Sequence, residues 1–469
     1  MSAADWAAVR FTIWQAILSA TISVVLAIPT ARALARRQFR GRGALITLLG
    51  APFILPVIVA VLGLLAVFGR NGLLNAGLAA LGLPEVSIYG LQGVVLAHVF
   101  FNLPLAIRLI LQGWLAIPAE HFRLAATLNL PVGQLLERPM LRQILPGAWL
   151  VIFLICLTSF AVALTLGGGP RATTVELAIY QALLFEFDLG RAAYLACIQF
   201  ALCVVAAIAV YLVSGVAESG AGLDRTVQRF DSAGTRLIDV AVLSSVAVFL
   251  LVPLAMIVAR GLPGLLQLPV EVYEAALRSI IVACSSAVLC GGMALALCLR
   301  GGPLLLVISA LPLAASALVV GTGLFLIVYP FVAPSDVALL VTTLVNATLA
   351  LPFAVRALAP EVTGVIRDYG RLAQSLGLSG WTGLRLVIIP RIRRPLGFAA
   401  GLAAALSMGD LGVITLFAGQ SEATLPLAMF RLMGAYQMEA AAGAGLLLLG
   451  ISLGLFWLFD RGGRVDADL

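Results

Sequence analysis

One acidic residue stands out as a candidate for chemistry because it lies inside a long apolar run. Asp410 occurs in the segment SMGDLG, within the apolar stretch 396–417. An isolated carboxylate deep in a membrane costs roughly 2.5–3.5 kcal/mol unless it faces a polar cavity or a partner. Asp410 could therefore offset the charge of a cation. Ser407, one turn earlier, could supply a hydrogen bond, and Gly409 and Gly412 would allow close approach. The alternative is that Asp410 holds helices together by pairing with Arg or backbone groups.

The other residues capable of chemistry argue against an enzyme. The sequence contains no G-x-x-x-x-G-K-[ST] motif, so it has no P-loop for hydrolysing ATP. Gly167-Gly168-Gly169 is not followed by Lys and favours a flexible turn. His98 and His121 are isolated from each other. The cysteines fall inside apolar runs without a C-x-x-C spacing, which indicates packing residues; they are Cys156, Cys197, Cys203, Cys284, Cys290 and Cys298. We predict neither a metal nor a cofactor.

The most informative pattern is a polar, Arg-bearing segment that occurs twice. Residues 123–130 read RLAATLNL and residues 371–378 read RLAQSLGL. The same separation of 248 residues brings 103–108 onto 351–356. Two matches at one separation indicate a duplicated unit. A short helix and turn between two apolar spans, present once per repeat, is suited to docking into a partner protein. An amphipathic loop lying on the membrane surface is the alternative.

Single residues in these segments fit a docking helix. The small side chains of Ala125, Ala126 and Ala373 allow a partner to approach closely. Gly377 can end the helix with a left-handed turn. Pro390 restricts the residue before it and starts the next span.

The composition places the repeated segments in a membrane protein. The chain has 469 residues, of which 62% are hydrophobic and only 11% are charged, against about 25% charged in soluble proteins. We predict an all-α polytopic membrane protein. About eleven runs approach the ~20 residues that cross a bilayer, namely 12–34, 44–68, 89–111, 144–166, 192–213, 237–259, 275–299, 303–329, 337–358, 396–417 and 440–459.

The distribution of Arg predicts the orientation. All 29 basic residues are Arg. Twenty-two lie in one set of loops and five in the opposite set, and basic loops face the cytoplasm. Both repeated segments and the C-terminus are therefore expected inside, with Met1 outside, in an inner membrane. The net charge of +7 is explained by these loops, so no nucleic acid partner is predicted, and membrane lipid is.

The repeat also divides the chain. Residues 174–178 and 424–428 match at a separation of 250. We predict a first transmembrane domain over 1–215, a cytoplasmic linker over 216–235 and a second domain over 236–469. The span 237–259 has no counterpart in the first half. We therefore expect the first domain to lack its first span, with a reading frame that begins upstream of Met1; a natural eleven-span protein is the alternative.

The repeated segment at 123–130 and 371–378 resembles the EAA loop of binding-protein-dependent type I ABC importer permeases. In that family, Pro follows nineteen residues after the Glu of a Glu-Ala-Ala opening, with a Gly between them. Arg371, Ala373, Gly377 and Pro390 fall on that frame. The chain departs from it in three ways: Arg replaces the Glu in both copies, Asn129 replaces the Gly in the first copy, and Pro139 comes three residues early there. The resemblance implies that two copies of an ABC ATPase subunit dock on the segments, through Arg123, Leu124, Ala125, Ala126, Asn129, Arg371, Leu372, Ala373, Gly377 and Pro390.

A resemblance to the fused permeases of thiamine and thiamine pyrophosphate ABC importers covers nearly the whole chain. It is carried by FTIWQAILSATISVVLAIPTARAL (11–34), YGLQGVVLAHVFFNLPLAIRLIL (89–111), LGGGPRATTVELAIYQAL (166–183), AQSLG (373–377) and SMGDLGVITLF (407–417). It implies two tandem repeats of the type I ABC importer transmembrane domain. It also implies a periplasmic thiamine-binding protein as partner and ATP hydrolysis by a separate subunit. Thiamine has a cationic thiazolium ring, which Asp410 and Ser407 could meet on the substrate path.

Two alternatives stay open. One is a fused iron(III) ABC permease, which has the same two-loop layout. The other is a secondary transporter or membrane enzyme. A secondary transporter is expected to carry several ionisable residues within its spans, and a membrane enzyme a cluster of His, Asp or Glu at a membrane face. The sequence offers Asp410 as the one clear intramembrane acid, which favours the permease.

Overall fold

In the computed structural model, all regular secondary structure of the described residues is helical, as predicted. The structure describes residues 2–50, 54–167, 169, 172–213, 233–302, 312, 315–419 and 421–463. Ten of the described helices, or runs of adjoining helices, are long and apolar enough to cross a membrane. The chain is therefore a multi-pass membrane protein.

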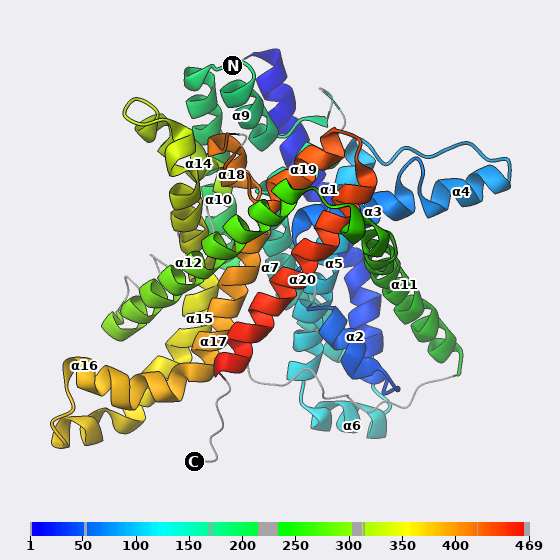
Figure 1. The fold of residues 1–469 in the computed structure, drawn as a ribbon. Coiled ribbons are helices and arrows are strands. Elements are labelled where there is room, and N and C mark those ends of the chain that lie inside the picture. Colours follow the sequence, from blue (N-terminus) through cyan, green and yellow to red (C-terminus); the bar gives the residue numbers. More distant parts are fainter. Residues whose placement is uncertain are drawn as a thin grey trace. The chain divides into compact units, whose positions relative to one another are not determined.

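The described residues form two compact units, and both can be followed in Figure 1 by their colours and labels. Unit 1 comprises Met1–Phe53, Ala60–Ala178 and Ala201–Ile257, and unit 2 comprises Ile54–Val59, Ile179–Phe200 and Val258–Leu469. The divisions fall within helices, so α3 (Val57–Phe68), α9 (Val175–Leu184), α10 (Leu189–Val213) and α11 (Ala233–Gly264) contribute to both units. The predicted linker 216–235 lies mostly outside the described residues.

Unit 1 is built around three helices that pack on one another, α1 (Ala3–Arg36), α5 (Leu91–Ala116) and α7 (Arg138–Leu157). The other helices of unit 1 are shorter: α2 (Arg42–Leu48), α3 (Val57–Phe68), α4 (Leu73–Ala80), α6 (Ala119–Thr127) and α8 (Phe160–Leu166). A capping box starts α1, in which the Ser2 hydroxyl accepts the amide of Asp5 and the Asp5 carboxylate accepts the amide of Ser2.

Unit 2 is built in the same way around α12 (Val270–Arg300), α15 (Ala338–Ser375) and α17 (Ile389–Met408), with α20 (Met438–Gly463) packed on α17. The shorter helices are α14 (Ala317–Val328), α16 (Gly380–Gly383), α18 (Gly412–Phe417) and α19 (Leu425–Gly434). Glycines let α20 and α17 approach closely, because a Cβ at Gly397 would lie 2.5 Å from the Phe459 carbonyl oxygen.

The predicted number of eleven spans differs from the ten found in the described part of the chain. The predicted span 303–329 accounts for the difference. Its described portion is α14, Ala317–Val328, which has 12 residues and is too short by itself to cross a bilayer. Residues 303–311 lie outside the described residues.

The predicted continuous span 44–68 becomes α2, which ends at Leu48, and α3, which begins at Val57. Two further predicted spans are each broken into two helices. The predicted span 144–166 becomes α7 and α8, separated at Thr158 and Ser159. The predicted span 396–417 becomes α17 and α18, separated at 409–411. Ser, Thr, Asp and Gly at these breaks favour local side-chain hydrogen bonds or non-helical backbone over a continued helix. Hydropathy alone does not register such breaks.

Candidate functional site

The first repeated segment forms a short helix that ends in a left-handed turn. In α6, the side chains of Arg123 and Leu124 are exposed, while Ala125 is buried. Asn129 follows with a φ of 51°, a conformation that Asn tolerates better than most residues. The amide of Leu130 then donates to the Ala125 carbonyl at 2.8 Å. This bond to the residue five positions back is the hallmark of a Schellman turn.

The second repeated segment ends in the same turn. Gly377 has a φ of +70°, so the left-handed conformation predicted for it is present. The amide of Leu378 donates to the Ala373 carbonyl at 2.8 Å. Arg371 and Leu372 are exposed here, and Ala373 is half-buried.

The two segments differ in how they connect to the preceding span. In unit 1 the helix stops at Ala116, Ile117 is extended and Pro118 precedes α6, as expected for a residue before proline. In unit 2 the position that matches Pro118 at a separation of 248 is Ile366. There, α15 runs without a break to Ser375. The separate short helix predicted for the second segment is therefore the end of a long helix.

Each segment presents matched leucines to the surface. The exposed fractions are 58% for Leu124 and 59% for Leu128, and 55% for Leu372 and 64% for Leu376. The residues in each pair are four apart, so they share one helix face. An exposed apolar pair among polar and Arg side chains is a feature of protein-binding surfaces.

A π-helical turn follows each segment at a separation of 251 residues. The first covers Gly133–Glu137 and the second covers Leu384–Ile388. In each, the next amide bonds five residues back, from Arg138 to Gly133 and from Ile389 to Leu384. The residue after that is Pro139 or Pro390. Because proline clashes with the carbonyl four residues earlier, the wider turn before it lets the helix continue.

Asp410 lies in the break between α17 and α18. Its Oδ1 accepts the amide of Gly412 at 3.1 Å, and so satisfies a backbone group that the break leaves free. Its Oδ2 is buried and makes no hydrogen bond of normal geometry within the described residues, although the side-chain amide of Asn346 lies close to the carboxylate. Pro56 lies 3.2 Å from a Cβ placed on Gly409, so the break is tightly packed.

Ser407 belongs to a buried chain of hydrogen bonds that joins three helices of unit 2. The Asn346 amide of α15 donates to the Ser407 hydroxyl at 3.0 Å. That hydroxyl donates to Ser286 of α12 at 3.2 Å, and Ser286 donates to the Thr343 carbonyl at 3.2 Å. Ser407 is thus engaged by its neighbours Asn346 and Ser286, and its predicted hydrogen bond to a ligand stays a prediction.

Unit 1 has a corresponding buried polar cluster that the sequence analysis missed. The Ser19 hydroxyl of α1 lies 3.3 Å from His98 Nδ1 of α5. The Asn102 amide donates to the His98 carbonyl at 2.9 Å and lies 3.3 Å from Cys156 Sγ of α7. The repeat could have indicated this cluster, because a separation of 248 residues matches His98 with Asn346.

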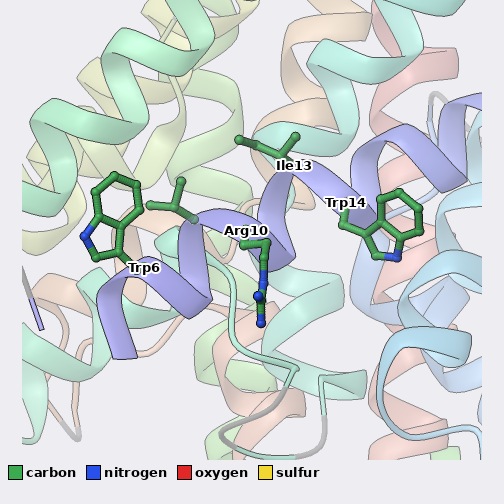
Figure 2. A pocket seen from close by; sticks show the side chains of 5 residues that line it. Trp6, Arg10, Ile13 and Trp14 are labelled. Atoms are coloured by element: carbon green, nitrogen blue, oxygen red, sulfur yellow. The ribbon is translucent and has the colours of Figure 1, made fainter. Parts of the chain in front are cut away.

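A shallow hollow on α1 is unsuited to a solute. Figure 2 shows the labelled Trp6, Arg10, Ile13 and Trp14 projecting from α1, and with Val9 these side chains line the hollow. Since they all belong to one helix face, they do not enclose a ligand as a binding pocket does. Trp6 and Trp14 are 61% and 54% exposed, which suits a lipid-facing surface with an interfacial Trp.

No group of three or more His, Cys, Asp or Glu side chains that could hold a metal ion occurs in the part of the chain that the structure describes.

Comparison with known proteins links this arrangement to transport. No model of a protein family matches the chain. The chain is 40% identical over 474 residues to the thiamine transport system permease protein ThiP of Brucella abortus (strain 2308), with 97% of this chain and 87% of the relative covered. It is 38% identical to ThiP of Escherichia coli (strain K12), with 99% and 90% covered. A molybdenum transport system permease protein, ModB of Mycobacterium bovis, is 30% identical over 208 residues, which cover 43% of this chain and 76% of that protein.

The left-handed turn at Gly377 generates a test that needs no assumption about activity. A Cβ at Gly377 meets nothing within 4 Å, so a substitution acts only through the backbone. Gly377→Val should raise the free energy of the turn by about 1–2 kcal/mol and speed tryptic cleavage at Arg371 or Arg385 by about five- to thirtyfold, with membrane insertion unchanged. Gly377→Asn is the matched control, since Asn129 adopts the same conformation in unit 1, and it should cleave like the wild type. Equal cleavage of the Val variant would contradict the assignment.

Proposed function

Because the chain belongs to the family of thiamine transport system permease proteins, we propose that it is the membrane-spanning subunit of an ATP-driven importer of thiamine or its phosphate esters. The observation that carries the proposal is the 38–40% identity to thiamine permeases over 97–99% of the chain. Within the described residues, ten helices or runs of adjoining helices able to cross a membrane agree with it. Family membership favours thiamine over iron(III), and a permease subunit over a secondary transporter.

We further propose that the chain is a tandem duplication of one transmembrane domain. The Schellman turns match at a separation of 248, and the π-helical turns and the helix breaks match at 251. A second hydrogen bond also recurs. The Thr12 hydroxyl of α1 accepts the amide of Val175 at 2.9 Å, and the Ser279 hydroxyl of α12 accepts the amide of Leu425 at 2.8 Å. The match of a separate molybdenum permease to 43% of this chain supports the same conclusion.

The two repeated segments are the proposed docking sites for two ABC ATPase subunits. Each presents a matched pair of exposed leucines beside an exposed Arg, and each ends in a fixed turn next to a π-helical turn. The excess of Arg in the loops that contain both segments supports a cytoplasmic location for them and for the C-terminus. A periplasmic thiamine-binding protein would deliver substrate from the other side.

Transport in vesicles tests this function. Vesicles are prepared with this chain in the membrane, its ATPase subunits and ATP enclosed inside, and the binding protein outside. They should accumulate labelled thiamine. The same vesicles without ATP, or with an ATPase variant unable to hydrolyse it, should accumulate none. Uptake of iron(III) and no uptake of thiamine or its phosphates would overturn the proposal.

We propose that Asp410 supplies the negative charge on the substrate path. It lies in the break between α17 and α18, three residues after Ser407. The thiazolium ring of thiamine carries a fixed positive charge, and a carboxylate in an apolar setting lowers the free energy of a nearby cation. One oxygen of Asp410 is engaged by the Gly412 amide, while Oδ2 makes no hydrogen bond of normal geometry to any residue that the structure describes. The corresponding position in unit 1, at a separation of 251, is Ser159, so the site is asymmetric.

Asp410→Asn separates the path role from a structural one. Asn keeps an oxygen that can accept the Gly412 amide, so the helix break and the assembly should persist. Loss of the charge should reduce thiamine uptake at least about tenfold, since a buried charge contact is worth more than about 1.4 kcal/mol. The exposed Asp336 of unit 2 supplies the control, and Asp336→Asn should transport normally. Normal uptake by Asp410→Asn would refute the path role, and failure to assemble would favour the structural one.

A further inference from the structure

Three arginines at the C-terminal end of α1 are paired with two buried carboxylates from distant parts of unit 1. Arg32 pairs with Glu137, and both Arg36 and Arg37 pair with Asp239. We call these five residues the α1 ion cluster. It connects the π-helical turn behind the first repeated segment, through α1, to the first turns of α11.

Asp239 is held on two sides. Arg36 donates from Nε to Asp239 Oδ2 at 2.8 Å and from Nη2 to Oδ1, which makes a bidentate pair. Arg37 donates from Nε to the same Oδ2 at 2.7 Å and from Nη2 to the Thr235 hydroxyl at 3.3 Å. The Asp239 side chain is only 4% exposed and that of Arg36 only 6%. The start of α11 is thereby fixed to the end of α1.

Glu137 makes the other connection. Its two oxygens receive Arg32 Nε at 3.3 Å and Nη2 at 3.0 Å. The indole Nε1 of Trp114, a fully buried residue of α5, lies 3.4 Å from Glu137 Oε1. Glu137 is the last residue of the π-helical turn Gly133–Glu137. Movement of that turn would therefore be passed directly to α1.

The energetics of the cluster favour a rigid connection. The side chains of Asp239 and Glu137 are only 4% and 7% exposed. Removing the arginine partner of either one would strongly destabilise the folded protein, because an unpaired charge would be left in the interior. Sliding α1 against α11 would break such pairs, whereas moving them together would not. By contrast, the exposed pair of Arg70 and Glu85, 84% and 57% exposed, is of the kind that contributes little.

Unit 2 lacks this arrangement at the matching place. The residue that corresponds to Glu137 at a separation of 251 is Ile388, the last residue of the second π-helical turn. Its side chain cannot pair with an arginine. The rigid connection therefore belongs to the first repeated segment.

We infer that the α1 ion cluster is a positioning device that makes the first docking segment, the end of α1 and the start of α11 move as one body. This inference rests on the proposed function, because the displacement would come from the ATPase docked on the first segment. The cluster would pass it to α11, the helix that opens the second half of the chain. Its residues would act on transport through the helices that they hold.

The coupling between ATP hydrolysis and transport tests the device. Asp239→Asn keeps the shape and removes the charge that holds both arginines. The variant should assemble with its ATPase and keep its basal hydrolysis, while the thiamine transported per ATP falls about fivefold or more. Asp239→Glu should restore part of the ratio because it retains the charge. Glu85→Gln, which breaks the exposed pair, is the matched control and should leave the ratio unchanged.

A second variant and a second measurement keep the test decisive if Asp239→Asn fails to fold. Glu137→Gln can still accept the Trp114 indole and should lower the same ratio. Spin labels on cysteines replacing the exposed Gln134 and Ile238, in a cysteine-free chain, report the distance between the π-helical turn and α11. In the labelled chain with an intact α1 ion cluster, this distance should stay constant when ATP is added. In the labelled Glu137→Gln variant, the mean distance should change or its distribution should broaden. A normal transport ratio or a constant distance in Glu137→Gln would overturn the inference. If the wild-type complex fails to transport thiamine, the proposed function fails, while the distance measurement still tests the device.

Discussion

Three short helices in the described residues, α9, α18 and α19, begin with a backbone amide that a side-chain oxygen accepts, and the fold depends on these bonds because such amides are costly to leave unpaired in an apolar setting. No water is available in a bilayer core to bond such amides, so an unsatisfied one costs several kcal/mol. Thr12 accepts the amide of Val175, and Ser279 accepts that of Leu425. Asp410 does the same for the amide of Gly412 at the break between α17 and α18. These bonds allow short helices and turns at membrane depth, where the chain can meet a solute.

The residues that fulfil local backbone requirements could be predicted from the sequence. Gly377 was expected in a left-handed turn, and the repeat placed Asn129 at the matching position. Asp410 was expected to be unusual, but the break around it was not, since mean hydropathy across the stretch remains high. The pairing of Arg36 with Asp239 joins residues 203 positions apart. Such a contact leaves no periodic or local pattern in the sequence, and only the folded chain brings the two side chains together.

The two halves differ most where charge is concerned. In the first unit, His98 stands where the second has Asn346, and Ser159 stands where the second has Asp410. Conversely, the acid of the first π-helical turn, Glu137, is replaced by an apolar residue in the second. The single carboxylate near a span break agrees with the proposal of one site for one cationic substrate. The turns that end the two repeated segments are matched in both halves, which agrees with the proposed docking of two ATPase subunits, whereas the connections to the preceding spans differ.

Cross-linking of the docking segments to the ATPase tests the central claim of a duplicated docking permease most directly. In a cysteine-free chain, a single cysteine replacing Leu124 or Leu372 should each cross-link to an ATPase subunit, and the chain carrying both should capture two subunits. A cysteine replacing the equally exposed Leu277 on the side of α12, 60% exposed, should capture none. Cross-linking from only one segment, or equal capture from Leu277, would contradict the account.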